Sequence, residues 1–289
     1  MKKILLIIIL NIYTFILYGQ NDIYTTKIEK PYNDIYGWNI GIATGFSFSN
    51  YIDFATSPLN YNGNPFNFSL AFIYHEEDLE FEMISSGLIG YFADQYHMGE
   101  NQSDVKIVNW ELSYLQKINK FNVQKLKLYV GGDFKFTYND RVNHTLQNNS
   151  WGYEIIPTLF ASSKLVWDIS RTQPKKGRFL FLSYYLKPRK RDLSFRLNIG
   201  IINASYRNHY IYTDADSFTT NNYNMWDKYV FKVFSGFRAG TETAYSIYLS
   251  NGNSIKFSYI WDAYKTGGDL DKLEMAHHIF NITLLYKID

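Results

Sequence analysis

The sequence His-Ile-Phe-Asn-Ile-Thr-Leu-Leu-Tyr-Lys-Ile occupies residues 278–288. Every second residue from Phe280 onward is apolar, and the residues between them include Asn281, Thr283 and Lys287. Successive side chains of a strand point to opposite faces, so one face of this segment is a continuous apolar ribbon and the other is mixed. The same pattern recurs upstream, which predicts many strands that separate an apolar surface from a polar one.

A segment near the middle of the chain shows what each surface must contact. The even positions of residues 126–136 are mostly Leu, Val or Phe, and they alternate with Lys125, Lys127, Asp133 and Lys135. A lysine that faces lipid at the bilayer midplane costs about 2–4 kcal/mol. We therefore expect the lysines to face a polar interior and the leucines to face hydrocarbon.

The composition of the 289-residue chain agrees with a membrane strand protein. Charged residues make up 19 %, aromatic residues 19 %, and the formal net charge is +2. Soluble proteins average about 25 % charged residues, and aromatic rings suit a membrane–water boundary. The small net charge gives no indication of nucleic-acid binding. Because the chain has no Cys, disulfides and thiolate chemistry are excluded, and we expect a closed hydrogen-bond ladder to supply stability.

The alternating segments predict the fold class directly. We count about 12 of them (roughly 10–14), each long enough to cross a bilayer when tilted. No helical period of any length appears after the N-terminal segment. The predicted fold is all-β: a transmembrane, antiparallel, up-and-down β-barrel of about 12 strands.

Chain direction is open in one part of the sequence. In one assignment, residues 179–186 form a spanning strand and residues 239–242 a turn, which places loop 207–224 on the periplasmic side. In the other, residues 151–170 are split into two strands and residues 227–250 form one. That second assignment returns the loop to the outside, where barrels of this kind have long loops. Because Ala-Gly-Thr-Glu resembles a turn, we favour the first.

The N-terminus predicts export. Lys2 and Lys3 precede an apolar run over residues 4–17, and Gly19 follows. This order is typical of a secretory signal peptide, and the run is short for a transmembrane helix, which needs about 20 residues. We therefore predict a cleaved signal peptide at residues 1–19, a periplasmic lead-in at 20–36 and the barrel at 37–289.

Together, the signal segment Lys2–Gln20, the alternating strands, the aromatic flanks and the closing strand 280–288 resemble single-chain outer-membrane β-barrels of Gram-negative bacteria. The resemblance covers nearly the whole chain after the signal segment, is architectural, and identifies no subfamily. It implies a location in the outer membrane and contact with outer-membrane lipid. It also implies insertion by the barrel-assembly machinery, to which such proteins offer their last strand.

Charged residues on the polar faces are candidates to line the lumen. They could form a basic-leaning pore for small anionic solutes, or ion pairs that fill a narrow barrel. About 12 strands is fewer than the roughly 16 of aqueous porins, so we favour the filled interior. The candidates are Glu80, Glu82, Glu111, Lys125, Lys127, Asp133, Lys135, Arg196, Lys228, Lys232, Arg238, Lys256 and Asp262.

Catalytic candidates are few. One arrangement across the last hairpin would combine Ser258, His277 and Glu274 or Asp262 as nucleophile, base and orienting acid. Some lipid-cleaving barrels carry a His-x-Ser-Asn-Gly-like motif, and residues 248–252 of this chain are Tyr-Leu-Ser-Asn-Gly. Tyr248 occupies the histidine position, so the general base that would deprotonate Ser250 is missing. The Asn-Gly pair in that segment is a hairpin-turn signal.

Histidines give no metal site. His277 and His278 are neighbours on a strand and point to opposite faces, so they cannot ligate one ion together. We expect no cofactor, no metal and no nucleic-acid partner. The predicted function is a non-catalytic outer-membrane barrel, structural or porin-like for small solutes, with a polar lumen that is either open or plugged. The alternatives are an outer-membrane lipid-modifying hydrolase and a soluble secreted β protein.

Overall fold

The computed structural model describes residues 35–94, 101–120, 125–146, 151–179, 182–208, 229–268 and 271–288. The predicted signal peptide at residues 1–19, and the predicted lead-in as far as residue 34, lie outside the described residues. In the described part of the chain, no helix is long and apolar enough to cross a bilayer.

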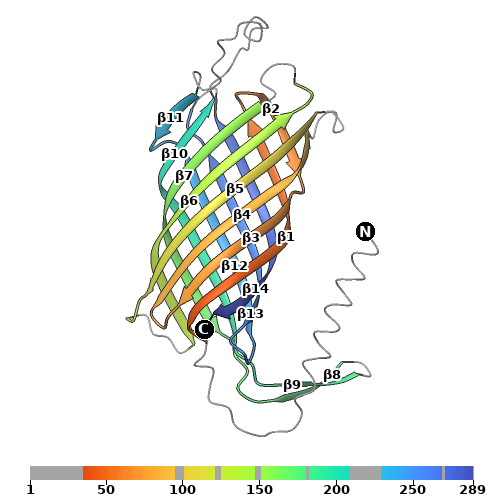
Figure 1. Ribbon diagram of the computed structural model, residues 1–289, viewed down its shortest axis with the longest axis vertical. Coiled ribbons are helices and arrows are strands. Elements are labelled where there is room, and N and C mark those ends of the chain that lie inside the picture. Colours follow the sequence, from red (N-terminus) through yellow and green to blue (C-terminus); the bar gives the residue numbers. More distant parts are fainter. Residues whose placement is uncertain are drawn as a thin grey trace, which may run out of the picture. The chain divides into compact units, whose positions relative to one another are not determined.

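Ten strands close into an antiparallel barrel in the described part of the chain (Figure 1). Each strand pairs with its neighbours in barrel order, and β14 returns to pair with β1, from Trp38 opposite Ile288 to Asp53 opposite Leu273. The barrel strands are β1 (Gly37–Asp53), β3 (Phe66–His75), β4 (Leu79–Asp94), β5 (Gln102–Lys117), β6 (Leu126–Asn143), β7 (Trp151–Asp168), β10 (Arg191–Asn208), β12 (Phe237–Tyr248), β13 (Ser254–Lys265) and β14 (Leu273–Ile288).

Two short strands continue barrel strands past a break. β2 (Ser57–Gly63) pairs with β1 and β4 and is followed by β3 after Asn64 and Pro65. β11 (Tyr229–Val233) pairs with β10 and is followed by β12 after a break in which Phe234 and Gly236 have positive φ. Each pair therefore forms one long, interrupted wall segment.

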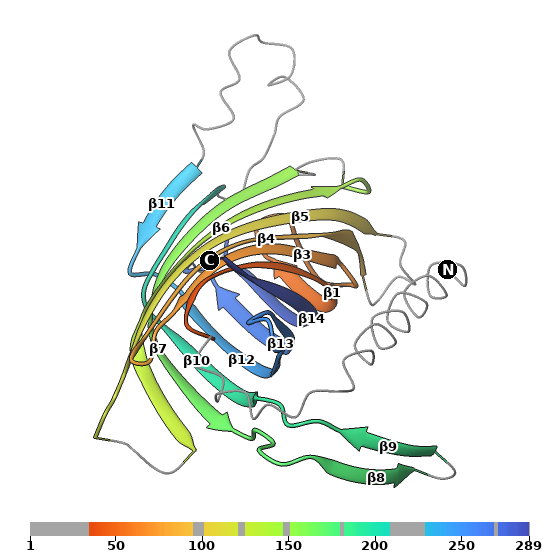
Figure 2. The same ribbon diagram turned by 60° about the horizontal axis from the view of Figure 1, so that its bottom comes forward.

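The remaining two strands pair only with each other. β8 (Lys175–Phe179) and β9 (Leu182–Leu186) form a separate two-stranded hairpin between β7 and β10 (Figure 2). This hairpin contains the segment 179–186, which the sequence predicted as a spanning strand. That assignment is wrong, because its apolar residues pair within the hairpin and leave the barrel wall to β7 and β10, which pair directly.

The predicted turn at residues 239–242 is also wrong. Ala239 and Gly240 lie inside β12 and are paired on both sides, with β10 and with β13. Residues 229–248 thus run as one interrupted strand, whereas β7 continues without a split across Ser162 and Ser163. The predicted fold class is confirmed, with a strand count at the lower end of the expected range.

The strand order fixes the two ends of the barrel. We call the end with residues 76–78, 118–125 and 249–253 the turn end, and it also holds the last described residue, Ile288. The opposite end is the loop end; the connections 95–101, 144–150, 209–228 and 266–272 leave from it. The connection 169–190 also leaves from the turn end. Because the other three connections there are short, as periplasmic turns of this class are, and β1 begins and β14 ends there, we assign the turn end to the periplasmic side.

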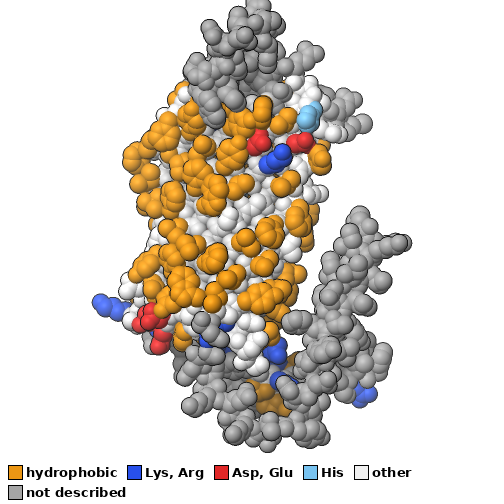
Figure 3. Space-filling view, in the orientation of Figure 1, with side chains coloured by type: hydrophobic (Ala, Val, Ile, Leu, Met, Phe, Trp, Pro, Cys, Tyr) orange, Lys and Arg blue, Asp and Glu red, His pale blue; other side chains and the backbone are white. Residues whose placement is uncertain are grey.

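The walls have the partition that the alternation predicted. On β14 the side chains at 280, 282, 284, 286 and 288 are 39–48 % exposed, whereas Asn281 and Thr283 are at most 9 % exposed. Hydrophobic side chains cover the barrel face seen in Figure 3. This is the reverse of a soluble β protein, in which apolar side chains face inward and polar side chains face water.

Aromatic side chains gather on the outer surface near the turn end. The rings of Trp38 and Tyr74 are 5.1 Å apart, and the ring of Phe81 lies 6.3 Å from Trp38. Tyr114 and Trp167 are 51 % and 52 % exposed on neighbouring parts of the same rim. Such rings mark the membrane–water boundary.

Lysine substitutions on β14 should therefore cost stability according to depth. Ile282 pairs with Thr44 in the middle of β1, so we expect Ile282→Lys to lower the free energy of unfolding by about 2–4 kcal/mol. The matched control Ile288→Lys at the turn end should lower it by at most about 1 kcal/mol. Urea titration in phospholipid vesicles measures both, and equal effects would contradict the membrane-facing assignment of β14.

Candidate functional site: the charged barrel interior

A cluster of four charged side chains crosses the lumen near the loop end. Asp53 accepts hydrogen bonds from Arg141 Nη2 at 2.7 Å and from Arg207 Nη2 at 2.6 Å. Arg141 also binds Glu154, whose carboxylate lies 3.7 Å from Arg207. All four side chains are at most 4 % exposed. We call Asp53, Arg141, Glu154 and Arg207 the loop-end charge cluster; its formal charges cancel.

This cluster also holds the connections at the loop end. Arg207 donates to the backbone carbonyl of Asp271 and, at 3.4 Å, to Thr266 Oγ1. Lys232 binds the Asp271 carboxylate at 2.7 Å. One arginine from β10 therefore links β1 to the connection between β13 and β14.

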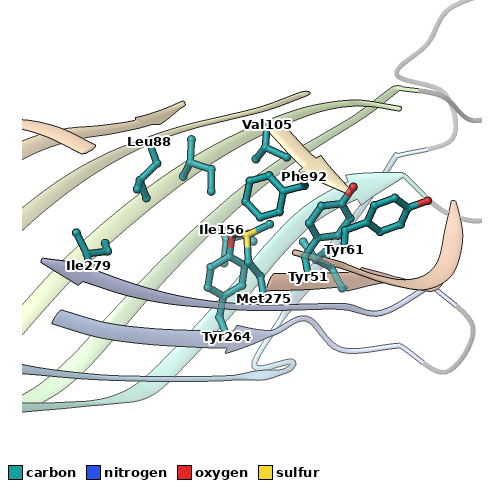
Figure 4. Close-up of a cluster of buried hydrophobic side chains, with 11 residues drawn as sticks. Tyr51, Tyr61, Leu88, Phe92, Val105, Ile156, Tyr264, Met275 and Ile279 are labelled. Atoms are coloured by element: carbon teal, nitrogen blue, oxygen red, sulfur yellow. Dashed lines mark hydrogen bonds between the residues drawn. The ribbon is translucent and has the colours of Figure 1, made fainter. Parts of the chain in front are cut away.

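A luminal hydrophobic cluster packs next to the loop-end charge cluster. Figure 4 shows its side chains. The rings of Tyr51 and Tyr61 stack at 4.9 Å, and the Arg141 guanidinium lies 4.9 Å from the Tyr51 ring. Tyr264 donates to Met275 Sδ at 2.9 Å. The buried members are Tyr51, Tyr61, Leu88, Phe92, Val105, Ile107, Ile156, Tyr264, Leu273, Met275 and Ile279.

A second charge cluster fills the middle of the barrel. Asp262 accepts from Arg238 Nη2 at 2.7 Å and from Lys135 Nζ at 2.9 Å. Lys135 lies 3.5 Å from the Glu111 carboxylate, and Arg238 donates to Thr137 Oγ1 at 2.9 Å. We call Glu111, Lys135, Arg238 and Asp262 the middle charge cluster.

A third cluster lies toward the turn end. Arg196 donates to Glu82 at 2.8 Å and lies 3.3 Å from Asp133. Lys164 binds Glu80 and lies 3.9 Å from Glu82. We call Glu80, Glu82, Asp133, Lys164 and Arg196 the turn-end charge cluster.

One contact in each of these clusters joins strands on different sides of the barrel. Asp53 and Arg207 belong to β1 and β10, Lys135 and Asp262 to β6 and β13, and Arg196 and Glu82 to β10 and β4. In each pair, three strands separate the partners along the shorter way round the ten-strand barrel. The charged side chains therefore reach across the lumen and do not merely coat its wall.

Eight of the residues predicted to line the lumen belong to the middle and turn-end clusters. Lys256 pairs with Glu242 at 2.6 Å, and Lys232 belongs to the loop end. Lys125 is exposed one residue before β6, where its φ of 71° interrupts the extended backbone, and Lys127 is half-buried. Lys228 lies outside the described residues. The eight are Glu80, Glu82, Glu111, Asp133, Lys135, Arg196, Arg238 and Asp262.

The sequence reasoning missed the loop-end charge cluster altogether. The sequence predicts loops near residues 52–63, 139–150 and 207–224, which contain Asp53, Arg141 and Arg207, and Glu154 lies in the less regular segment 151–169. The alternation did indicate one of these residues. On β6 the odd-numbered residues around Lys135 face inward, and Arg141 is odd-numbered too. Extending the alternating runs of β1 and β6 by a few residues would have placed Asp53 and Arg141 inside, but on β10 the register shift between Gly200 and Ile202 reverses the parity before Arg207.

The possible catalytic residues do not meet. Asp262, not Ser258, is opposite His277 in the ladder, so Ser258 is four residues away, about 13 Å along the strand. His277 Nδ1 instead lies 2.9 Å from Ser49 Oγ. Glu274 pairs with Lys265 at 3.0 Å near the loop end. Among the described residues, no group of His, Asp and Glu has the arrangement of a metal site.

No protein-family model and no curated protein matches the sequence. Solved structures with a similar fold include Neisserial surface protein A, at a TM-score of 0.38 and 9 % identity, covering 87 % of this chain and 97 % of that chain. The outer membrane protease OmpT from Escherichia coli has a TM-score of 0.49 and 6 % identity, covering 87 % and 96 %. The transport unit of the autotransporter AIDA-I from Escherichia coli has a TM-score of 0.38 and 9 % identity, and the match covers 96 % of this chain and 97 % of that chain.

The assignment of this chain follows from its own geometry. The backbone ladder is closed, the outer wall is apolar, and the charges are inside and paired. The chain is an outer-membrane β-barrel. Within a bilayer, only a helix or a closed barrel satisfies every backbone polar group, and the hydrocarbon accounts for the exposed Phe, Leu and Ile side chains.

Asp53→Asn should strongly destabilise the barrel. The substitution leaves Arg141 and Arg207 sharing the single carboxylate of Glu154, and breaking a buried ion pair costs about 3–5 kcal/mol. Asp104→Asn is the matched control, because Asp104 is 37 % exposed beside an exposed His144; its effect should be at most about 1 kcal/mol. Chemical unfolding in vesicles compares the two, and similar midpoints would argue against the loop-end charge cluster.

Proposed function

We propose that this protein is a non-catalytic outer-membrane barrel with a sealed lumen and a structural role, rather than a solute channel. The observation that carries the proposal is the series of contacts between opposite walls at three levels, with the luminal hydrophobic cluster packed among them. A permeable pore would need a continuous water-filled path past all of these layers.

The charge balance supports the same conclusion. A pore selective for anions requires basic groups whose field reaches the solute. In the three charge clusters, every Arg and Lys contacts at least one carboxylate, and the loop-end cluster is neutral. These ion pairs leave little positive field to attract an anion, so we favour the structural interpretation over the porin-like one.

The size of the barrel points the same way. Eight strands leave an interior that side chains can fill, whereas 16-stranded porins enclose an aqueous channel. Ten strands lie close to the first case.

A lipid-modifying hydrolase receives no support from the interior. Ser49, which does contact His277, is 5 % exposed, and His277 is 2 % exposed. The nearby Asp262 carboxylate is occupied by Arg238 and Lys135 rather than by the imidazole. Insertion by the barrel-assembly machinery through the last strand stays a prediction.

The sealed lumen is tested by permeability. Vesicles that carry the refolded full chain should swell in isosmotic small sugars or salts no faster than empty vesicles, and planar bilayers should show no steady current. Flotation of the protein with the vesicles, and heat-dependent migration on gels, verify insertion and folding. Swelling that increases with the amount of inserted protein would overturn the sealed-lumen proposal in favour of transport.

A further inference from the structure

The β8–β9 hairpin is a long connection at the end of the barrel that otherwise has short ones. The turns at residues 76–78 and 249–253 are brief, whereas residues 169–190 join β7 to β10 through a hairpin that the barrel wall does not need. β7 and β10 pair directly from Asp168 opposite Asp192 upward. Closure of the barrel therefore does not explain the hairpin.

The hairpin is strongly basic. Residues 171–191 contain eight Lys and Arg residues and no Asp or Glu. Blocks of like charges repel one another and are often segments that bind an oppositely charged partner. The eight are Arg171, Lys175, Lys176, Arg178, Lys187, Arg189, Lys190 and Arg191.

Three of these cations already have contacts at the base of the hairpin. Arg171 donates to the Lys187 carbonyl at 3.4 Å, and Arg191 donates to the Ile169 carbonyl at 3.4 Å. Lys190 lies 5.3 Å from the centre of the Tyr248 ring, and burial lowers the pKa of its ammonium group. The Arg171 contact lies within the hairpin base, and the Lys190 contact joins the base to β12.

Four others are directed to the surroundings. The side chains of Lys176, Arg178, Lys187 and Arg189 are exposed, and none of them forms an ion pair with any residue that the structure describes. Tyr185 lies directly opposite Lys176 in the hairpin and is 56 % exposed. Exposed cations beside an aromatic ring suit a membrane interface, where the ring sits at the headgroup level.

The base of the hairpin lies next to the membrane boundary. Trp167, 52 % exposed on the outer wall, is one residue before the end of β7, and Arg171 follows four residues later. Arg171 and Arg189 form an antiparallel bridge, and the Ile169 amide donates to the Arg191 carbonyl at 3.0 Å. Four extended residues span at most about 14 Å, so the hairpin begins within reach of the lipid headgroups.

We propose that the β8–β9 hairpin binds the phosphodiester headgroups of anionic phospholipids in the adjacent periplasmic leaflet. The four free cations supply the charge, and Tyr185 supplies the ring for the interface. Each Lys or Arg near an anionic membrane surface increases binding by a factor of about five. This proposal is independent of whether the lumen is sealed.

The absence of Cys from the sequence allows a clean test with the full chain. Thr172→Cys, at an exposed position beside the hairpin base, carries an environment-sensitive fluorophore in neutral detergent micelles. We expect a saturable response to phosphatidylglycerol and at least about tenfold weaker binding of phosphatidylcholine. Adding Lys176→Gln and Arg178→Gln should weaken phosphatidylglycerol binding by about 5- to 25-fold.

A matched pair of substitutions controls for overall charge. Lys106→Gln with Lys265→Gln removes two exposed cations near the loop end and should leave the affinity within about twofold, because these cations lie far from the hairpin base. Heat-dependent gel migration shows that each variant is folded. Equal affinity for the two lipids, an unchanged affinity after the hairpin substitutions, or equally tight binding of inorganic phosphate would each overturn the proposal. A label whose fluorescence does not change when phosphatidylglycerol is added would also overturn the proposal, and would favour a protein partner instead.

Discussion

Pairing of the first barrel strand with the last is the constraint on which the rest of the structure depends. A backbone amide in hydrocarbon has no water to bind, so the sheet is stable in a bilayer only when no edge is left open. The β1–β14 ladder runs over the whole length of β1 and provides that closure. Once the sheet is closed, each side chain faces either lipid or the lumen, and the alternation along every strand must agree with that choice.

The lumen then has to accept every charge that lipid excludes. An unpaired charge buried in the interior of the barrel is costly, so each Arg and Lys of the three charge clusters contacts a carboxylate on a neighbouring strand or across the lumen. A buried ion pair need not be more stable than apolar packing of the same size. Its geometric effect is clearer: Asp53 and Arg207 are far apart in sequence and three strands apart in the barrel. We infer that such pairs help to fix which walls face each other.

Much of this partition could be predicted from the sequence. Side chains alternate with a period of two residues along a strand, and this alternation shows which residues share a face. The faces of β14 and of the segment around Lys135 were assigned correctly on that basis. The period does not give the partner of an inward charge, which lies on a strand far away in the sequence. Arg141 was therefore missed although it continues the alternation of β6, whereas Arg207 follows a register shift between Gly200 and Ile202 that reverses the inward parity of β10.

Strand boundaries failed for a different physical reason. Composition marks where a turn is easy, but a turn forms only where no neighbour pairs with the segment. Ala239 and Gly240 have turn-like composition, yet strands on both sides satisfy their backbone groups. The real break, at Phe234 and Gly236, lies where the backbone turns to positive φ between β11 and β12. Conversely, the apolar run within residues 179–186 has the composition of a spanning strand but pairs within its own hairpin.

The net charge of +2 is the sum of two unequal parts of the molecule. The sequence contains 29 Lys and Arg and 27 Asp and Glu, and eight of those cations belong to residues 171–191, which have no acid. The remainder of the chain is therefore acidic overall, with 21 cations against 27 carboxylates. Since the luminal clusters are close to neutral, this uneven distribution of charge lies at the ends of the molecule more than in its core. A basic extramembrane hairpin at the turn end distinguishes the two sides of the membrane electrostatically, even though the chain as a whole is nearly neutral.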